Sequence, residues 1–371
     1  MKLRYILCIA ILFLMLPIAA QKITLGSCQT RDGGAYKGEM QAGKPHGKGK
    51  TIWKNGNAYD GQYEKGKRHG HGVFTFFDGE KYDGQWMQDH QHGQGTFYYA
   101  NNNKFEGLWY RDEQEGHGVM YYYNGDVYNG NWRMGKRHGK GRYTFKSGDY
   151  YDGEWALDKK NGNGKFYWKD GSSYEGLWKD DRKQGKGTFR YANGDVYTGN
   201  FANDVQNGKG IYKFSNGDTY DGDYANGERT GVGIFRTHDG DKYTGQFLKG
   251  EKHGQGTWVR KNGDTYSGMW QHDMLDGQAK VAYKNGDLLE GTFRHGKPHG
   301  ECIARFADGT KFKGHFKNGK RNGPAIEQDK EGNRFEGTYV DDKRDGHFVE
   351  KDRNGNVTAR GTYTRGRRQV E

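Results

Sequence analysis

The sequence predicts an all-β fold: an elongated, single-layer antiparallel sheet built from stacked 23-residue β-hairpins. Three observations predict this fold. An aromatic residue followed two positions later by glycine recurs every 23 residues, as at Tyr36, Tyr59 and Tyr82, as far as Phe335, and only Leu289 replaces the ring. Glycine is abundant, with 63 residues against 4 prolines, and aromatic residues make up 15% of a chain that is only 32% hydrophobic. A fixed period of this length means that each repeat is one supersecondary unit whose neighbours complete its core.

Residues 1–20 form a separate element. Lys2 and Arg4 precede an apolar run over residues 5–20, and polar sequence begins at Gln21. This layout predicts a secretory signal peptide cleaved after Ala20, and the run is short for a membrane span of about 20 residues. An uncleaved anchor and a lipoprotein modified at Cys28 remain open alternatives. Residues 21–35 lead into the first repeat.

Each repeat divides into two strands, as the segment over residues 128–150 illustrates. Aromatic and glycine residues alternate from Tyr128, so they share one face of a first strand. Residues 134–138 are polar and predict a loop, and the alternation then resumes in a second strand. We expect six structural residues on the strand face that carries the aromatic and glycine residues: Gly130, Trp132, Gly139, Gly141, Tyr143 and Phe145.

A tight turn closes the repeat at Ser147-Gly148-Asp149, and Asn124-Gly125 and Asn285-Gly286 take its place in other repeats. Asn-Gly between alternating runs is a strong hairpin signal, in which we expect both turn residues to have positive φ. The strand glycines leave room for a ring on the neighbouring strand.

The pattern changes near the carboxyl end. The second glycine of the second strand persists for ten repeats and is then replaced. Cys302 is one of these replacements, which predicts a small, buried packing residue. Glu327 and Asp329 occupy ring positions of the thirteenth repeat, as we expect where stacking approaches its end. We assign residues 36–358 to fourteen repeats and residues 359–371 to a partial repeat and a basic tail. The glycine replacements are Ala279, Cys302, Ala325 and Phe348.

The unit Tyr-x-Gly-x-Trp, basic segment, Gly-x-Gly, two spaced aromatics and Asn-Gly-Asp resembles the MORN (membrane occupation and recognition nexus) repeat, over residues 36–363. The resemblance implies a single-layer trough of stacked hairpins. Members of the family mostly act as scaffolds, as membrane-associated or lipid-binding modules, or as accessory regions beside a catalytic domain. Since this chain has no counterpart of such a domain, we expect no enzyme. A signal followed only by repeats looks like a bacterial envelope protein, which implies a periplasmic, envelope-associated or secreted location.

The sequence does not predict a catalytic site or a metal-binding site. The chain contains no G-x-S-x-G or H-E-x-x-H motif. Six histidines recur before the first glycine of the second strand, but equivalent atoms of adjacent repeats lie about 9–10 Å apart. Two imidazoles that share one zinc, each about 2 Å from the metal, cannot span that distance. We therefore predict no catalytic residue, no metal and no cofactor. The histidines are His46, His69, His92, His138, His253 and His299.

Paired basic residues in the predicted loops are the candidate anion-binding sites. The net charge is +12, which falls to +10 when Lys2 and Arg4 leave with the signal. Basic residues near an anionic membrane contribute about 1 kcal/mol each. The alternative is that these loops are simply solvated and bind no anion. Aspartates lie beside several of the pairs and cancel much of their positive electrostatic potential. The pairs are Lys136, Arg137, Lys159, Lys160, Arg182 and Lys183 in three consecutive repeats, and Lys320, Arg321, Lys343 and Arg344 near the carboxyl end.

These features predict a non-enzymatic binding scaffold of the cell envelope, which presents a long β-trough to a protein or a membrane surface. One alternative is direct binding of anionic phospholipid through the basic loop tips. A second is carbohydrate binding by exposed rings such as Tyr121 and Tyr123. Nucleic acid is not expected as a partner, because an exported chain seldom meets it and the rings are needed in the core.

Overall fold

A computed structural model describes residues 22–370, so the predicted signal peptide lies outside the described residues. Residues 22–370 form thirty-two β-strands and no helix. The described part accordingly has no helix that is long and apolar enough to cross a membrane. Contacts divide it into two compact units, residues 22–146 with 156–158 and residues 147–155 with 159–370.

In the first unit, each strand pairs antiparallel with the next strand in the chain. Its strands are β1 (Thr24–Gln29), β2 (Ala35–Gln41), β3 (Lys44–Ile52), β4 (Ala58–Glu64), β5 (Lys67–Thr75), β6 (Lys81–Met87), β7 (His90–Tyr98), β8 (Lys104–Tyr110), β9 (Glu113–Tyr121), β10 (Val127–Arg133) and β11 (Lys136–Thr144).

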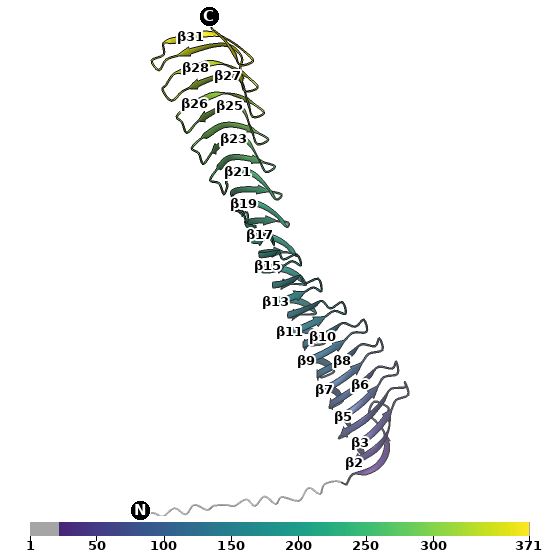
Figure 1. Cartoon of the computed structure of the whole chain (residues 1–371). Helices are drawn as coiled ribbons and strands as arrows, with labels where there is room; N and C mark the ends of the chain where they lie inside the picture. Colours follow the sequence, from purple (N-terminus) through teal and green to yellow (C-terminus); the bar gives the residue numbers. More distant parts are fainter. Residues whose placement is uncertain (1–21, 371) are drawn as a thin grey trace, which may run out of the picture. The chain divides into compact units, whose positions relative to one another are not determined.

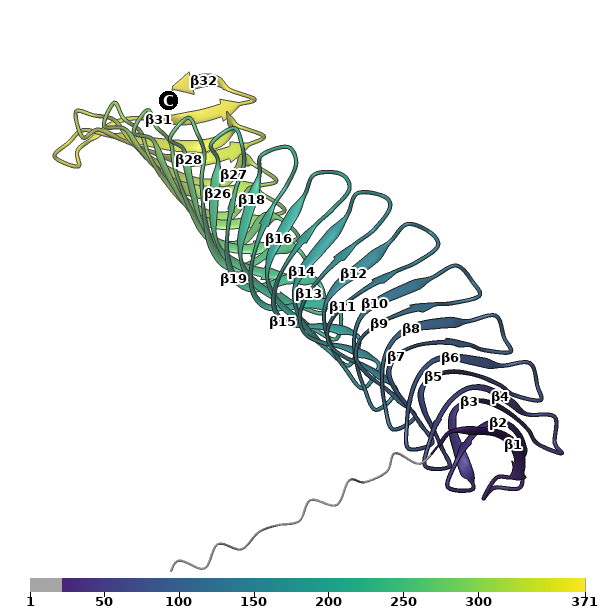
Figure 2. The same cartoon turned by 90° about the horizontal axis from the view of Figure 1, so that it is seen from below.

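The second unit begins with β12, and from β13 onward it repeats the same antiparallel pairing; β28 pairs with both β29 and β30. Within each unit the hairpins lie side by side in chain order (Figures 1 and 2). The predicted all-β class and antiparallel sheet of successive hairpins are confirmed. The strands are β12 (Tyr150–Ala156), β13 (Lys159–Tyr167), β14 (Ser173–Lys179), β15 (Arg182–Arg190), β16 (Val196–Ala202), β17 (Val205–Lys213), β18 (Thr219–Ala225), β19 (Glu228–Arg236), β20 (Lys242–Leu248), β21 (Glu251–Val259), β22 (Thr265–Gln271), β23 (Met274–Ala282), β24 (Leu288–Arg294), β25 (Lys297–Arg305), β26 (Lys311–Lys317), β27 (Lys320–Gln328), β28 (Arg334–Val340), β29 (Lys343–Arg344), β30 (Gly346–Lys351), β31 (Val357–Thr364) and β32 (Arg367–Val370).

The prediction of a polar loop over residues 134–138 is wrong, because the turn comprises only Met134 and Gly135. Both have positive φ, 49° and 70°, as a two-residue type I′ hairpin requires. Residues 136–138 already belong to β11. The pairing register between β10 and β11 shifts beyond Gly130, and Gly139 has a φ of 61° in the bulged segment. This bulge accommodates the extra residues that the sequence pattern placed in a loop.

The Asn-Gly turn also differs from the prediction that both of its residues have positive φ. The amide of Tyr122 donates to the Asp126 carbonyl over 2.9 Å, which closes a loop of three residues. Of these three only Gly125 has positive φ, at 92°. A type I turn followed by a left-handed glycine gives this geometry. The primed turn therefore lies at the opposite end of the hairpin from the Asn-Gly sequence.

A column of aromatic rings forms the core, and we call the side of the sheet that carries it the aromatic face. The Tyr59 ring is fully buried and lies across Gly61 and Gly72, where any added Cβ would collide with the tyrosine side chain. The Tyr59 hydroxyl donates to the Gln62 carbonyl over 3.0 Å. Burial raises the pKa of that hydroxyl, so Tyr59 remains a neutral donor.

Trp86 links the aromatic residues of successive repeats. Its indole Nε1–H donates to the Gly72 carbonyl over 3.0 Å. Its ring meets Tyr59 and Tyr82 edge to face, at centroid distances of 5.3 and 5.2 Å. Edge-to-face pairs contribute about 0.5–1.5 kcal/mol beyond area burial. Trp132 repeats the arrangement with Phe105 and Tyr128, and its Nε1–H donates to the Gly118 carbonyl.

Carboxylates of the Asn-Gly turns connect one repeat to the next. Asp195 Oδ1 accepts the Ser215 amide over 2.7 Å, and Oδ2 accepts the Tyr212 hydroxyl over 2.8 Å. The Ser215 hydrogen bond, followed by that of Tyr212, lowers the pKa of Asp195. Asp218 accepts the His238 amide in the same way, and its pKa is also lowered. The charged form of each aspartate is therefore favoured in the folded protein.

This lowering gives the second unit an acid-sensitive stability. A depressed folded pKa stabilises the fold above the unfolded value of about 3.9, and the stabilisation is lost as pH falls through the folded pKa. We expect urea denaturation, followed by tryptophan fluorescence, to show stability declining as pH falls below about 4. Asp195→Asn should flatten this decline, and Asp221→Asn, on an exposed carboxylate, serves as the control. Equal acid sensitivity of the wild type and Asp195→Asn would contradict the assignment.

Candidate functional site

A second row of rings covers part of the aromatic column and leads to the candidate site. In the second unit it runs from Phe166 through Trp168, Phe189 and Tyr191, with centroids 4.4–5.2 Å apart. It continues through Tyr212 and Phe214 to Phe235. In the first unit, Tyr143 and Phe145 belong to the same kind of row, with centroids 4.7 Å apart. Each of these repeats contributes two rings to the row, one from the second strand and one from the position just after it.

The second member of each basic pair packs on rings of this row or of the core column and does not point outward from a loop tip, in contrast to the prediction. Lys183 Nζ lies 4.9 Å from the Phe189 ring centroid, and burial lowers the pKa of Lys183. Arg137 lies over Tyr143 at 5.3 Å and Lys160 over Trp178 at 4.4 Å. These residues lie in the strands, because the turn has only two residues.

The same residues are held by the next repeat. The amide of Lys183 donates to Asp204 Oδ1 over 2.8 Å, and Asp204 is the second turn residue, with a φ of 75°. Aspartate tolerates this left-handed conformation better than most residues. The equivalent pairs are Arg137 with Asp158, Lys160 with Asp181, and Arg321 with Asp342.

The first member of each pair is exposed at the two-residue turn. Lys159 lies 3.7 Å from Asp180, and Lys320 lies 4.0 Å from Asp341, so acidic neighbours offset part of their charge. Lys136 and Arg137 belong to the first unit, and the other eight residues belong to the second. The exposed first members are Lys136, Lys159, Arg182, Lys320 and Lys343.

The row of rings opens into a cavity near the carboxyl end of the second unit. The residue nearer the core shrinks in successive repeats from Trp258 to Val281 and Ala304, and is then replaced by Glu327. A cavity of about 830 Å³ lies where these rings are missing. Its floor is apolar, formed by Leu289, Ala304, Phe312, Phe316 and Phe335.

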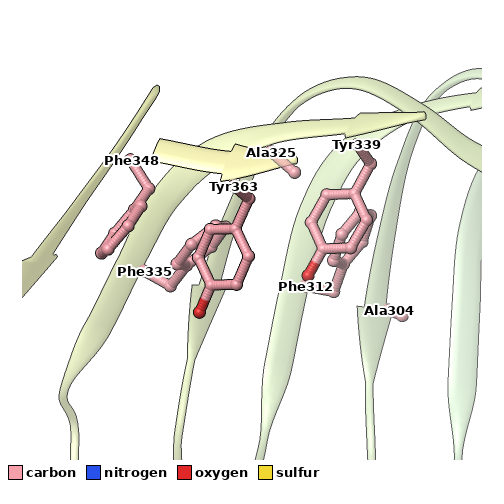
Figure 3. Close-up of a cluster of buried hydrophobic side chains, with 7 residues drawn as sticks. All are labelled: Ala304, Phe312, Ala325, Phe335, Tyr339, Phe348 and Tyr363. Atoms are coloured by element: carbon pink, nitrogen blue, oxygen red, sulfur yellow. The ribbon is translucent and has the colours of Figure 1, made fainter. Parts of the chain in front are cut away.

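Figure 3 shows Phe312, Phe335, Tyr339, Phe348 and Tyr363 gathered on one side of the ribbon, with the small Ala304 and Ala325 among them. Phe335 stacks on Phe348 at 5.9 Å and meets Tyr363 edge to face at 6.0 Å. These rings anchor the floor at its carboxyl-terminal end, while the side chain of Ala304 leaves the space above it open.

One wall of the cavity is a network of ionic and phenolic groups. Glu327 accepts the Tyr339 hydroxyl over 2.5 Å and forms ion pairs with Arg321 and Arg344. The Arg344 guanidinium also lies 3.8 Å from the Phe335 ring centroid. Burial, together with Glu327, raises the pKa of Tyr339 to about 12. Glu327 is therefore part of a wall within the array, although its position suggested a polar terminal repeat.

The cavity was missed by reasoning from the sequence. The signal was present in the loss of rings at Val281, Ala304 and Glu327, but that loss alone fits the end of a stack equally well. The two rings that remain, Tyr283 and Phe306, are 40% and 44% exposed at the cavity rim. Their exposure depends on the missing inner neighbours and could not be predicted position by position.

Cys302 is buried, with its Sγ 3.6 Å from the Thr292 carbonyl, and burial raises the pKa of its thiol. The prediction of a small packing residue is therefore confirmed. The two cysteines in the described range, Cys28 and Cys302, are both free. Within residues 22–370 no group of three or more His, Cys, Asp or Glu side chains is arranged to hold a metal.

The rings considered for carbohydrate binding lie at separate places. Tyr121 carries the Lys104 amine 4.4 Å from its ring centroid, so a cation already covers part of that ring. Tyr123 is 75% exposed at the tip of an Asn-Gly turn.

Comparison with solved structures gives matches of low identity. The TCP domain of SAS-4 (dCPAP) of Drosophila melanogaster, in complex with a proline-rich motif of Ana2, has a TM-score of 0.28 and 14% identity, covering 42% of this chain and 85% of that chain. A mutant TCP10 domain of Danio rerio CPAP has a TM-score of 0.17 and 11% identity, covering 72% and 99%. Virginiamycin B lyase from Staphylococcus aureus has a TM-score of 0.14 and 10% identity, covering 77% and 97%. All three TM-scores lie below 0.5.

Comparison with curated proteins gave no match. The model of the MORN repeat, in contrast, matches fourteen successive segments from residues 36–58 to residues 335–357. These segments span most of the sequence, including the row of rings and the cavity. The chain belongs to the MORN repeat family.

Proposed function

We infer that this protein is a repeat scaffold or binding protein, as its MORN repeats indicate. We propose that this protein is a non-enzymatic scaffold whose cavity in the second unit accepts a segment of a protein partner. We also propose, from the layout of residues 1–20, that it is exported and acts in the cell envelope or outside the cell.

The cavity is the observation that carries the proposal. Its volume of about 830 Å³ lies within the range of about 300–1,000 Å³ that is typical of ligand sites. The apolar floor supplies buried area, and the network around Glu327 supplies fixed polar groups. Such a combination suits a peptide with both apolar and polar side chains.

The residues that line the cavity favour binding over chemistry. Its lining contains no serine or cysteine nucleophile and no histidine, the side chain that most often acts as a general acid or base. Glu327 and Arg344 neutralise each other by direct contact. The proposal therefore needs no catalytic residue and no cofactor.

A peptide-display selection on the purified protein tests the proposal. Selected peptides should lose binding to the variant Ala304→Trp, in which an indole fills the cavity, and should bind the variant Ala192→Trp normally. Ala192 is exposed in a turn of the same unit and does not line the cavity. Circular dichroism and thermal unfolding would verify that both variants fold. Peptides that bind all three proteins equally, or a selection that enriches none, would overturn the proposal.

Anionic membrane binding is a second candidate, favoured by the two-residue turns of the first unit. Met134 and Leu157 are 71% and 67% exposed at these turns, and Lys136 is exposed beside Met134. An apolar side chain beside a basic one suits the interface of an anionic bilayer.

We expect co-sedimentation with anionic but not neutral liposomes, weaker at physiological salt and weaker still in Met134→Ser/Lys136→Ser. The matched variant Asn226→Ser/Glu228→Ser changes the equivalent turn positions of another repeat. Binding that is unaffected by salt and by the first variant would exclude this candidate.

A further inference from the structure

We propose that the occupant of the cavity is a proline-rich segment in polyproline II conformation, with the register Pro-x-x-Pro-x-x-Arg or Lys. This inference rests on the proposed function and specifies its ligand. The first proline of the ligand would contact Tyr283, the second proline would contact Phe306, and the basic residue would contact Asp329.

These three residues occupy the same position of three consecutive repeats, and all three line the cavity. Each follows directly after its second strand: β23, β25 and β27 end at Ala282, Arg305 and Gln328. Two antiparallel strands separate equivalent positions, so their spacing is about 9.4–9.8 Å. The cavity thus offers ring, ring and carboxylate at nearly equal intervals.

The interval selects the backbone conformation of the ligand. A polyproline II helix has three residues per turn and rises about 9.3 Å per turn, so every third side chain returns to the same face. An α-helix brings a side chain back after seven residues and about 10.5 Å, which accumulates an error of about 2 Å over two repeats. In a β-strand, residues three apart point to opposite faces. Polyproline II is the closest match of the three.

The chemistry of the surface matches the same ligand. Tyr283 and Phe306 are exposed rings that flank the small floor residue Ala304, and aromatic-lined grooves bind prolines of preformed polyproline II segments at low entropic cost. The nearby Glu327 is already paired with Arg344. The remaining contacts of the ligand would therefore be apolar, except at its basic end.

Charge fixes the direction of the ligand. Asp329 is held in its turn by the Asn333 amide and side chain, and these hydrogen bonds lower its pKa, which keeps it charged. The equivalent residue before Tyr283 is Arg260, which lies over Trp258. The column thus runs from a cation through two rings to a carboxylate. Asp287 also lines the cavity, beside Tyr283, so the direction follows from the order of the column itself, in which the carboxylate of Asp329 comes after the two rings.

Besides Arg321 and Arg344, three cations line the cavity, Lys311, Arg334 and Lys351, and Lys351 is already paired with Glu336. Lys311 and Arg334 immediately precede the buried Phe312 and Phe335 in their strands. Because successive side chains of a strand alternate between faces, both basic side chains belong to the opposite face of the sheet. Arg321 and Arg344 lie on the aromatic face, where Glu327 is their common partner.

Fluorescence anisotropy with three labelled peptides of equal length and net charge tests the inference. The first carries Pro-Ala-Ala-Pro-Ala-Ala-Arg, the second has the same residues with one alanine fewer between the prolines and one more before arginine, and the third is an alanine-rich amphipathic helix. We expect the first to bind at least about tenfold more tightly than the others. Phe306→Ala and Asp329→Lys should each weaken its binding by about tenfold, and Ala192→Trp should not.

A charge exchange separates a direct contact from a disturbed fold. Asp329→Lys should bind a peptide ending in Glu better than the peptide ending in Arg. Equal binding of the first two peptides would overturn the polyproline register. Preference for the helical peptide, lost in Ala304→Trp, would overturn the inference but leave the protein-binding function standing. A failure of all three peptides, together with an empty display selection, would overturn both.

Discussion

Trp86→Ala is expected to destabilise the first unit by about 3–5 kcal/mol, the cost of removing a large buried aromatic side chain. The indole is buried, meets Tyr59 and Tyr82 edge to face, and donates to the Gly72 carbonyl. Its loss leaves a cavity between two repeats and an unsatisfied carbonyl. In a repeat array each hairpin contacts only its neighbours, so the damage should be concentrated around β4–β7. Hydrogen exchange followed by mass spectrometry measures it there.

Trp86→Phe is the matched control. It keeps a ring and removes the indole donor, so we expect a smaller loss, of about 0.5–1.5 kcal/mol for the hydrogen bond plus a small packing cost. The chain itself supports this expectation, because Phe201 and Phe247 occupy the equivalent position and are buried against Tyr174 and Tyr220. If both variants lost protection equally, the ring contacts of Trp86 would not be what connects these repeats.

The fold could be predicted because its strongest constraints are periodic. Alternation from Tyr128 fixes which residues face the core, and the constant repeat length fixes the neighbours. The turns were harder, since the sequence placed the primed turn at Asn124-Gly125 and the structure places it at Met134-Gly135. Asn-Gly suits a type I turn with a left-handed glycine as well as a type I′ turn, and only the pairing of the flanking strands decides between them.

The side chains of the basic pairs illustrate what a pattern cannot give. Lys136 and Arg137 are adjacent and chemically similar, yet Lys136 is exposed and Arg137 lies over the Tyr143 ring. The side chain that points toward the rings is determined by the bulge at Gly139, because the bulge shifts the pairing register of the two strands. The composition of the segment does not reveal the size of that shift. A short turn with a bulge and a long loop have the same sequence length.

The second expected effect is a favourable coupling, in the free energy of unfolding, between the substitutions Tyr220→Leu and Gly233→Cys in the column of aromatic rings. Tyr220 is fully buried, and a Cβ built on Gly233 would lie 2.5 Å from its hydroxyl oxygen. Gly233→Cys alone should therefore cost about 1–3 kcal/mol by overpacking. Tyr220→Leu alone should cost about 2 kcal/mol or more, because it removes ring contacts with Tyr224 and Phe247.

Combined, the two changes should cost less than their sum by about 1–2 kcal/mol, within the usual range for residues in contact. The reason is already present in the chain: three repeats later, the positions of Tyr220 and Gly233 are occupied by Leu289 and the buried Cys302. A smaller residue over the strand removes the clash that the thiol would otherwise cause. Urea denaturation of the four proteins, followed by tryptophan fluorescence, gives the coupling. Gly233→Cys combined with the remote Tyr174→Leu should be additive within about 0.5 kcal/mol, and equal behaviour of the near and the remote pair would refute the proposed contact.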